Sequence, residues 1–243
     1  MIAHRGASRI APENTLAAFQ AAAEMGADAI ELDARLSADS AVVVHHDLTL
    51  DRTTNGTGSV SARSLADLKA LDAGAKFNPR FAGERIPSLD EVFEALGRRV
   101  LINIELKNYE SVLDRLAEVV LRIVRRYGLE RRVLLSSFNP FALWTAHRLA
   151  PDVPRGLLVW PGQKGWMQAT LRRLTAFEAY HPQESLTDRV TIADQHAQGH
   201  RVNVWTVNDV GRMRELLFLG CDGLITDVPD AARQAVRDVA DAG

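Results

Sequence analysis

The sequence predicts an α/β fold: a TIM (β/α)₈ barrel with a small inserted subdomain after the second strand. Short apolar runs of strand length recur along the whole chain, and helix-like segments separate most of them. Eight such pairs fit within 243 residues, a common length for a single α/β barrel. We therefore expect one domain over residues 1–243, interrupted by a subdomain at 47–87.

The predicted elements alternate in chain order. Pro12 suits the start of the first helix, Leu16 and Phe19 share its apolar stripe, and Gly26 ends it. Further helices are expected at 88–97, 111–127 and 209–219. The predicted barrel strands lie at residues 2–4, 29–33, 101–105, 133–136, 155–159, 176–180, 202–206 and 223–226.

A ninth strand-like run, AVVVHH, follows the second strand after the short polar turn SADS. Parallel neighbours need a crossover of about a dozen residues, whereas antiparallel neighbours need only a tight turn. We expect 34–46 to fold back as a hairpin about Asp39 and Ser40, which places His46 near Asp33. The glycines of the insertion at 47–87 also allow a phosphate-binding loop, although no strand-then-helix context flanks them.

Polar side chains occupy one face of two predicted strands. Because strand side chains alternate, Glu31 and Asp33 share a face, and Asn103, Glu105 and Lys107 share a face of the next barrel strand. The apolar face of a barrel strand packs outward on helices, so these polar groups should point inward. They lie near the carboxyl ends of the strands, where active sites of this fold are found.

Three carboxylates in one barrel mouth repel each other unless a cation compensates them. Oxygen ligands suit Mg²⁺ or Ca²⁺, so Glu31, Asp33 and Glu105 predict a divalent metal site. The alternative is a structural network in which Arg5 and Lys107 neutralise the acids. The strand pattern alone does not separate the two.

Two histidines are expected at the same mouth. His4 ends the first predicted strand beside Arg5, and His46 ends the hairpin. Two imidazoles supply an acid–base pair with pKa values in the useful range, and a guanidinium clamps an anion. His181, at a strand end, is a further candidate, whereas His45 faces away and is expected to be structural.

The composition excludes several classes of partner. Lys and Arg number 29 and Asp and Glu 31, so a net charge of −2 offers no footprint for nucleic acid or an anionic membrane. No apolar run approaches the roughly 18 residues of a membrane span. We expect a cytoplasmic monomer or homodimer without stable membrane insertion, and a buried, unreactive Cys221. Residues 158–174 suit an amphipathic outer helix or a lipid-facing lip.

The motifs resemble, in order, those of the glycerophosphodiester phosphodiesterase family, within the phospholipase C-like phosphodiesterase superfamily. The resemblance runs from His4 to Pro229, and any single motif would be weak evidence without the others. The motifs are AHRGAS, APENTLAAF, GADAIELDARLSAD, VVVHHDLTLDRTTNGTG, FAGERIPSLDEV, INIELK, LLSSFNP, VNVWTVN and DGLITDVP.

The resemblance implies a role for each polar residue of the mouth. The histidines of the family's HRG and HD motifs correspond to His4 and His46, which would be the general acid and base. The family's metal-binding acids correspond to Glu31, Asp33 and Glu105. Which histidine is the acid stays open, as does the choice between Mg²⁺ and Ca²⁺.

The resemblance also implies a substrate-binding set. Arg5 and Lys107 would hold the phosphate, and Trp205 would lie near the glycerol, although it also suits a barrel-filling aromatic. The chain departs from the family pattern at Ser40, where the turn usually has glycine, and at Ala34, where the motif usually has valine. Neither departure touches the expected chemistry.

The implied activity is that of a metal-dependent hydrolase of lipid and glycerol metabolism. It would convert glycerophosphodiesters, such as glycerophosphocholine or glycerophosphoethanolamine, into sn-glycerol 3-phosphate and an alcohol. Water would attack directly, or the glycerol 2-hydroxyl would attack first and form a cyclic phosphate. The alternatives are a lysophospholipase D-type lipid phosphodiesterase on the same barrel, a catalytically silent binding barrel, and an unrelated barrel enzyme such as a sugar-phosphate isomerase.

Overall fold

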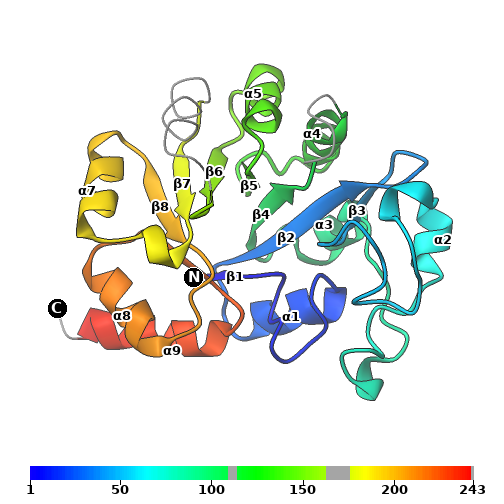
Figure 1. The fold of residues 1–243 in the computed structure, drawn as a ribbon, viewed down its shortest axis with the longest axis horizontal. Coiled ribbons are helices and arrows are strands. Elements are labelled where there is room, and N and C mark those ends of the chain that lie inside the picture. The colour runs from blue at the N-terminus through cyan, green and yellow to red at the C-terminus, as the bar shows by residue number, and fades with distance from the viewer. Residues whose placement is uncertain (109–113, 163–175, 242–243) are drawn as a thin grey trace.

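A computed structural model describes residues 1–108, 114–162 and 176–241. Within them, eight parallel strands close into a barrel, because β1 pairs with both β2 and β9 (Figure 1). The predicted TIM barrel is thereby confirmed. The barrel strands are β1 (Ile2–Ala3), β2 (Ala29–Leu36), β4 (Leu101–Leu106), β5 (Val133–Ser137), β6 (Arg155–Val159), β7 (Ala179–Pro182), β8 (Arg201–Val204) and β9 (Gly223–Thr226).

Helices cover the outside of the barrel and bury one face against it. In α4, for example, Leu116, Val120 and Val124 are buried, and Gly128 ends the helix in a left-handed conformation. A large buried cluster joins these side chains to the outward-facing apolar residues of β2 and β4. The helices are α1 (Leu16–Glu24), α3 (Leu89–Leu96), α4 (Leu116–Tyr127), α5 (Pro140–Leu149), α7 (Arg189–Ala197), α8 (Val210–Phe218) and α9 (Pro229–Asp241).

The sixth barrel strand, β7, starts later than predicted, at Ala179 instead of residue 176. Phe177 is apolar because it packs in a buried cluster with Leu143 and Leu157 just before the strand begins. The beginning of the helix predicted at 111–127 and most of the segment 158–174 lie outside the described residues.

The predicted hairpin is present. Strand β3 (Val42–Val44) runs antiparallel to β2, with Ala34 opposite Val44 and Leu36 opposite Val42, so the turn centres on Asp39. The backbone N–H of His45 donates to the carbonyl of Asp33, which places His46 one residue further along than the predicted pairing. In this register strict alternation would place His45 on the inward face of Asp33, but β3 ends at Val44, and beyond it His46, and not His45, lines the barrel mouth.

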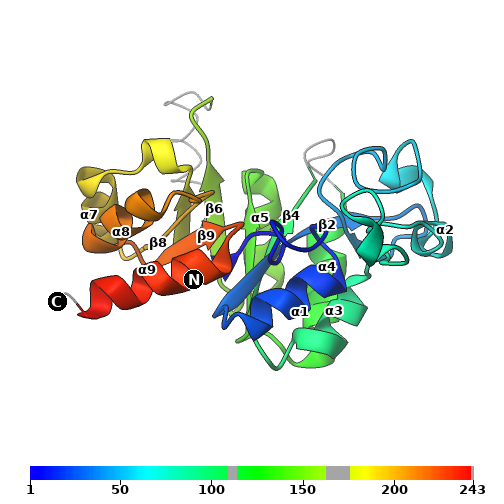
Figure 2. The ribbon, with the colours of Figure 1, turned by 90° about the horizontal axis from the view of Figure 1, so that it is seen from below.

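The segment between β3 and α3 forms a compact unit on one side of the barrel. It contains α2 (Leu65–Lys69) and the 3₁₀ turns η1 (Val60–Ala62) and η2 (Pro79–Phe81). Its apolar side chains make a small cluster of their own. In both views α2 lies on the opposite side of the molecule from α7, α8 and α9 (Figure 2). That residues 47–87 form a subdomain remains a prediction.

The predictions about membrane spans and about Cys221 concern the rest of the chain. No helix in the described parts of the chain has the length and apolar character needed to cross a bilayer. Cys221 is buried in an apolar cluster with Leu216 and Leu224, and burial raises the pKa of its thiol to about 12. The thiol is therefore protonated and apolar in character, as expected.

Candidate active site

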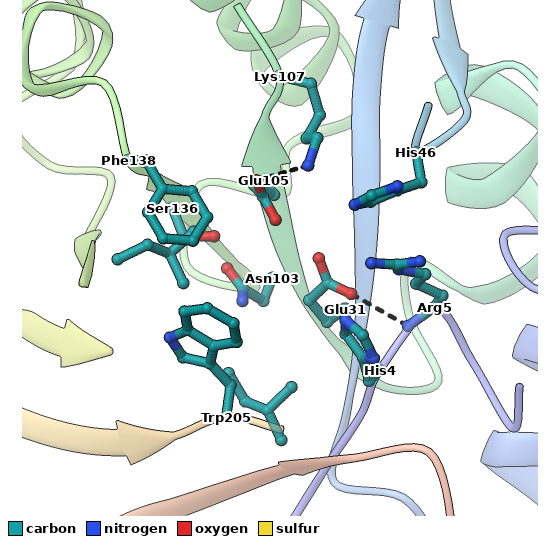
Figure 3. Close-up of a pocket in the computed structure, with 12 residues that line it drawn as sticks. His4, Arg5, Glu31, His46, Asn103, Glu105, Lys107, Ser136, Phe138 and Trp205 are labelled. Atoms are coloured by element: carbon teal, nitrogen blue, oxygen red, sulfur yellow. Dashed lines mark hydrogen bonds and ion pairs between the residues drawn. The ribbon is translucent and has the colours of Figure 1, made fainter. Parts of the chain in front are cut away.

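The three predicted acids meet inside the barrel mouth. Asp33 in β2 lies directly opposite Glu105 in β4, and Glu31 lies one alternation earlier on the same inward face. Each offers a carboxylate oxygen, and the three oxygens lie within 4.8 Å of one another. The exposed fractions are 3% for Glu31, 0% for Asp33 and 8% for Glu105. Figure 3 shows Glu31 and Glu105 with the other residues that line this cavity.

The environment pushes the pKa values of two of these acids in opposite directions. Burial, together with repulsion by Asp33 and Glu105, raises the pKa of Glu31 well above its usual value. Burial alone would also raise the pKa of Asp33, but Lys107 and Arg5 outweigh it and hold that pKa below its usual range. The carboxyl group of Asp33 is thus strongly ionised, whereas that of Glu31 resists ionisation.

Two cations lie against the acids. Lys107 Nζ is 3.1 Å from Glu105 Oε1 and 3.5 Å from Asp33 Oδ1, and Arg5 Nε is 3.3 Å from Asp33 Oδ2. The predicted charge network therefore exists, but it sets two cations against three acids. Asp33 Oδ1 is buried and accepts no hydrogen bond from any residue that the structure describes. The surplus of carboxylate and the all-oxygen donor set fit a divalent metal.

The loop after β1 is folded tightly onto this cluster. Arg5 and Asn14 both have positive φ angles, of 55° and 58°, and the N–H of Asn14 donates to the carbonyl of Arg5. Gly6 has φ 83°, and a Cβ there would lie 2.6 Å from the backbone of Ala18. Asn14 Nδ2 donates to Asp33 Oδ2 at 2.7 Å, and the N–H of Arg5 donates to Glu31 Oε2 at 3.0 Å.

The two predicted histidines line the same cavity, which has a volume of about 70 Å³. Each is hydrogen-bonded through Nδ1 to a carboxylate: His4 to Asp227 at 2.7 Å and His46 to Asp47 at 2.6 Å. The Nε2 atom of each ring is thereby left for a substrate. Burial lowers the pKa of His46, and the nearby Arg5 adds to this effect.

A chain of ion pairs ties His46 to the inserted segment. Arg52 donates to Asp47 Oδ2 at 2.6 Å and to both carboxylate oxygens of Glu13 at 2.7 Å, and Glu13 accepts from Arg5 at 3.1 Å. This chain links the loop after β1, the end of the hairpin and the segment after it. Asp47, Arg52 and Glu13 therefore connect His46 to Arg5.

The opposite wall of the cavity is uncharged. Trp205 lies beside Phe138, with ring centroids 5.4 Å apart and nearly perpendicular ring planes (Figure 3). The Trp205 indole N–H donates to the carbonyl of His181 at 2.7 Å, which fixes the ring. Asn103 and Ser136 also line the cavity, and their side-chain polar atoms are buried and make no hydrogen bond within the described parts of the chain.

All eight predicted site residues lie together, although Asp33 is covered by its neighbours and does not line the cavity itself. The further candidate His181 does not line this cavity. It is fully buried deeper in the barrel, where burial lowers its pKa to about 3. His45 bonds Thr53 and the carbonyl of Asp47 away from the mouth, as expected. None of the glycines at 56, 58, 74 and 83 lines the cavity either.

Several residues that support the site had no predicted role. Asn14 and Asp227 lie within the APENTLAAF and DGLITDVP motifs, so the sequence pointed to them without a function. Arg35 is buried and donates to the carbonyls of His46 and Lys107, an arrangement that alternation along β2 suggests but does not specify. Phe138 likewise lies within the LLSSFNP motif and had no predicted role.

Comparison with known proteins agrees with this geometry. The family model "Glycerophosphoryl diester phosphodiesterase family" matches residues 4–231. A glycerophosphodiester phosphodiesterase of Caldanaerobacter subterraneus is 42% identical over 98% of this chain and 97% of its own. A phosphodiesterase of Oleispira antarctica, solved with the product sn-glycerol-3-phosphate, has a TM-score of 0.89 and 34% identity over 97% of this chain and 96% of that chain.

A solved glycerophosphodiester phosphodiesterase of Agrobacterium tumefaciens is also similar, with a TM-score of 0.82 and 34% identity over 96% of this chain and 98% of that chain. These similarities extend over the whole barrel and include every element that carries a candidate site residue. The chain belongs to the glycerophosphoryl diester phosphodiesterase family.

Proposed function

We propose that the protein hydrolyses glycerophosphodiesters to sn-glycerol 3-phosphate and an alcohol. One observation carries this proposal: three buried acids, two cations and two histidines that each bond a carboxylate lie together at one cavity. The barrel that holds this cavity matches the family model. Relatives named glycerophosphodiester phosphodiesterase, and a similar barrel solved with sn-glycerol-3-phosphate, support the reaction class.

The residues of the chain divide the chemistry among themselves. His4 and His46 would move the protons, one from the attacking oxygen and the other to the leaving alcohol, each contributing about 10²- to 10⁴-fold. Arg5 and Lys107 would stabilise the negative charge that grows on the phosphoryl oxygens. Arg5 is well suited to this because Asp33 and Glu13 raise its pKa despite burial, so it stays charged.

Glu31, Asp33 and Glu105 would hold the divalent ion, Mg²⁺ or Ca²⁺. When bound, such an ion supplies Lewis-acid polarisation of a phosphoryl oxygen and lowers the pKa of a bound hydroxyl. The chain's own contribution is to keep three carboxylates together at a buried position, which Lys107 and Arg5 make possible. The uncharged wall of Trp205 and Phe138 suits the glycerol half of the substrate.

The direct test measures glycerol 3-phosphate released from glycerophosphocholine, with EDTA and then with Mg²⁺ or Ca²⁺ restored. We expect turnover to vanish with EDTA and to return with at least one of the two ions. Retention of full turnover in EDTA would overturn the proposed metal requirement. Lysophosphatidylcholine in parallel distinguishes a lipid phosphodiesterase, which would prefer it.

Single substitutions test the two histidines. His4→Ala and His46→Ala should each lower kcat by about 10²-fold or more because a proton transfer is lost. His196→Ala is the matched control, since His196 also bonds a carboxylate at 2.7 Å, on Asp222, outside the site. Near-full activity in either site variant would refute the acid–base assignment.

The proposal also covers the compartment, the partners and the assembly of the protein. A single buried cysteine and a near-neutral charge support a cytoplasmic protein without a nucleic-acid partner. A monomer or homodimer is the proposed assembly, which size-exclusion chromatography with light scattering would test.

A further inference from the structure

The carboxylate behind His4 has only uncharged partners besides the histidine among the hydrogen bonds of the described residues. Asp227 follows β9, and Oδ1 of its side chain is 2.7 Å from His4 Nδ1 and accepts from Ser8 Oγ at 3.1 Å. Its other oxygen, Oδ2, accepts from Asn208 Nδ2 at 2.7 Å. The carboxylate behind His46 differs, because Asp47 shares its charge with Arg52.

The orientation of the Asn208 amide is determined by its neighbours. Asn208 Oδ1 accepts from the backbone N–H of Asp227 at 2.9 Å and from Thr226 Oγ1 at 3.0 Å. The Thr226 hydroxyl accepts from the backbone N–H of Val228 at 3.1 Å, so its single proton is free to go to Asn208. A backbone N–H can only donate, and Asn208 must therefore present its oxygen there and its NH₂ group to Asp227.

We propose that Asn208 and Asp227 are positioning residues that together select the tautomer and the orientation of His4. With both oxygens of Asp227 acting as acceptors, the neutral His4 ring must carry its proton on Nδ1. The unprotonated Nε2 is then the nitrogen presented to the cavity that His4 lines. The effect on rate rests on the proposed function, whereas the effect on the tautomer does not.

Asp227→Asn is the first test, and the hydrogen bonds above predict its outcome. Asn208 still demands an acceptor at the position of Oδ2, so the new amide must turn its oxygen there and its NH₂ toward His4. His4 Nδ1 must then accept, and the ring switches to the Nε2–H tautomer. We expect ¹⁵N NMR of histidine-labelled protein, at a pH where the ring is neutral, to show this switch, with His4 signals assigned by their loss in His4→Gln.

The same variant should lower kcat by about 10²- to 10⁴-fold, with KM changed only a few-fold, because a catalytic histidine in the wrong tautomer cannot exchange its proton with the substrate. Mg²⁺ binding measured by calorimetry should not change. Asp222→Asn is the matched control, since it alters another His–Asp pair with the same 2.7 Å distance, to His196. It should leave both the His4 tautomer and kcat as in the wild type.

The double variant Asn208→Asp with Asp227→Asn exchanges the two groups. The carboxylate introduced at position 208 would accept from the amide NH₂ at position 227, which turns the oxygen of that amide back to His4 and restores the Nδ1–H tautomer. We expect at least a tenfold recovery of kcat over the single variant. This rescue also shows that the loss in the single variant is not a failure to fold.

Two results would overturn the inference: an Nε2–H tautomer in the wild-type protein, or an unchanged tautomer in Asp227→Asn. A double variant that keeps the Nε2–H tautomer would equally refute the role of Asn208. If the wild-type protein released no glycerol 3-phosphate while the tautomers behaved as described, the proposed function would fail and the positioning of His4 would stand.

Discussion

The two ends of the barrel are both polar, but in different ways. The mouth concentrates three acids and two cations around a cavity of about 70 Å³. The opposite end has a larger cavity, of about 290 Å³, whose buried polar groups include Asn103 and His181. Charged residues such as Asp28, Arg131 and Asp222 also line the larger cavity, but they are exposed, so among the described residues that line the two cavities, buried charge is confined to the mouth. Asn103 lines both cavities, so the change from buried charged to buried neutral groups takes place along the barrel strands.

The two ends therefore differ in buried charge as well as in open volume. At the deep end, His181 Nε2 and Asn203 Nδ2 lie 2.9 Å apart, and neighbouring glycines leave room for them: a Cβ on Gly156 or Gly223 would lie within 2.6 Å of one of these side chains. This pair is neutral because burial suppresses protonation of His181. The mouth instead keeps buried charges, which are held by the ion pairs of Lys107 and Arg5 and are expected to add little net stability.

The largest difference between the two ends should appear in turnover. Glu31→Gln should lower kcat by about 10³-fold or more, because it removes a proposed metal ligand. Without metal it should raise Tm, since a buried carboxyl that resists ionisation is replaced by a neutral amide. His181→Gln, at the deep end, should leave kcat within a few-fold. Kinetics and thermal melts with and without Mg²⁺ check both variants, and equal losses of kcat would remove the distinction between the ends.

Removal of a cation should reduce stability most at the mouth. Lys107→Met leaves Asp33 and Glu105 without the ammonium that lies 3.5 and 3.1 Å from them, and should destabilise the metal-free protein by about 3–5 kcal/mol. Lys69→Met, which breaks a partly exposed pair with Glu91, should cost no more than about 1 kcal/mol. Urea unfolding measures the loss of unfolding free energy in both variants. Comparable losses would show that the buried acids of the mouth do not depend on Lys107 for their stability.

The two ends should also affect stability with opposite pH dependence. The folded-state pKa of Glu31 is raised, so the folded protein binds a proton that the unfolded chain releases, and stability should fall as pH rises above 4.5. The pKa of His181 is lowered from 6.5 to about 3, so the unfolded chain binds the extra proton, and stability should fall as pH drops below 6.5. Each slope is at most about 1.4 kcal/mol per pH unit.

Difference curves between wild type and Glu31→Gln, and between wild type and His181→Gln, isolate the two slopes in EDTA. Mg²⁺ should abolish the first slope and leave the second unchanged, because a bound cation favours the ionised form of Glu31. Slopes of the same sign at both ends would contradict this description of the barrel.

The smallest effect is expected outside both cavities, at the hairpin turn. Ser40 has φ 63°, a conformation that favours glycine, which is the residue that the family usually has there. Ser40→Gly should therefore stabilise the protein by about 0.5 kcal/mol, or about 1–2 °C in Tm, without a change in kcat. Ser61→Gly, within η1, is the matched control and should not stabilise.

Much of the site could be predicted from the pattern within single strands together with the predicted barrel. Alternation grouped Glu31 with Asp33 in β2 and Glu105 with Lys107 at the end of β4, and the predicted barrel directed both faces inward. The expected position of His181 close to the mouth was wrong, because its strand begins at Ala179 and the position of the strand decides how deep the side chain lies. Strand ends are set by packing around them, in this case by Phe177, and not by the apolar run alone.

The sequence by itself determined the barrel, its inward polar face and the motifs of the family, because strand alternation and helix periodicity are local properties of the chain. Only the tertiary structure decided which carboxylate lies behind each histidine. Asp47 is adjacent to His46, but Asp227 is 223 residues from His4 and reaches it through the pairing of β1 with β9. Closure of the barrel creates that contact, and no local pattern encodes it.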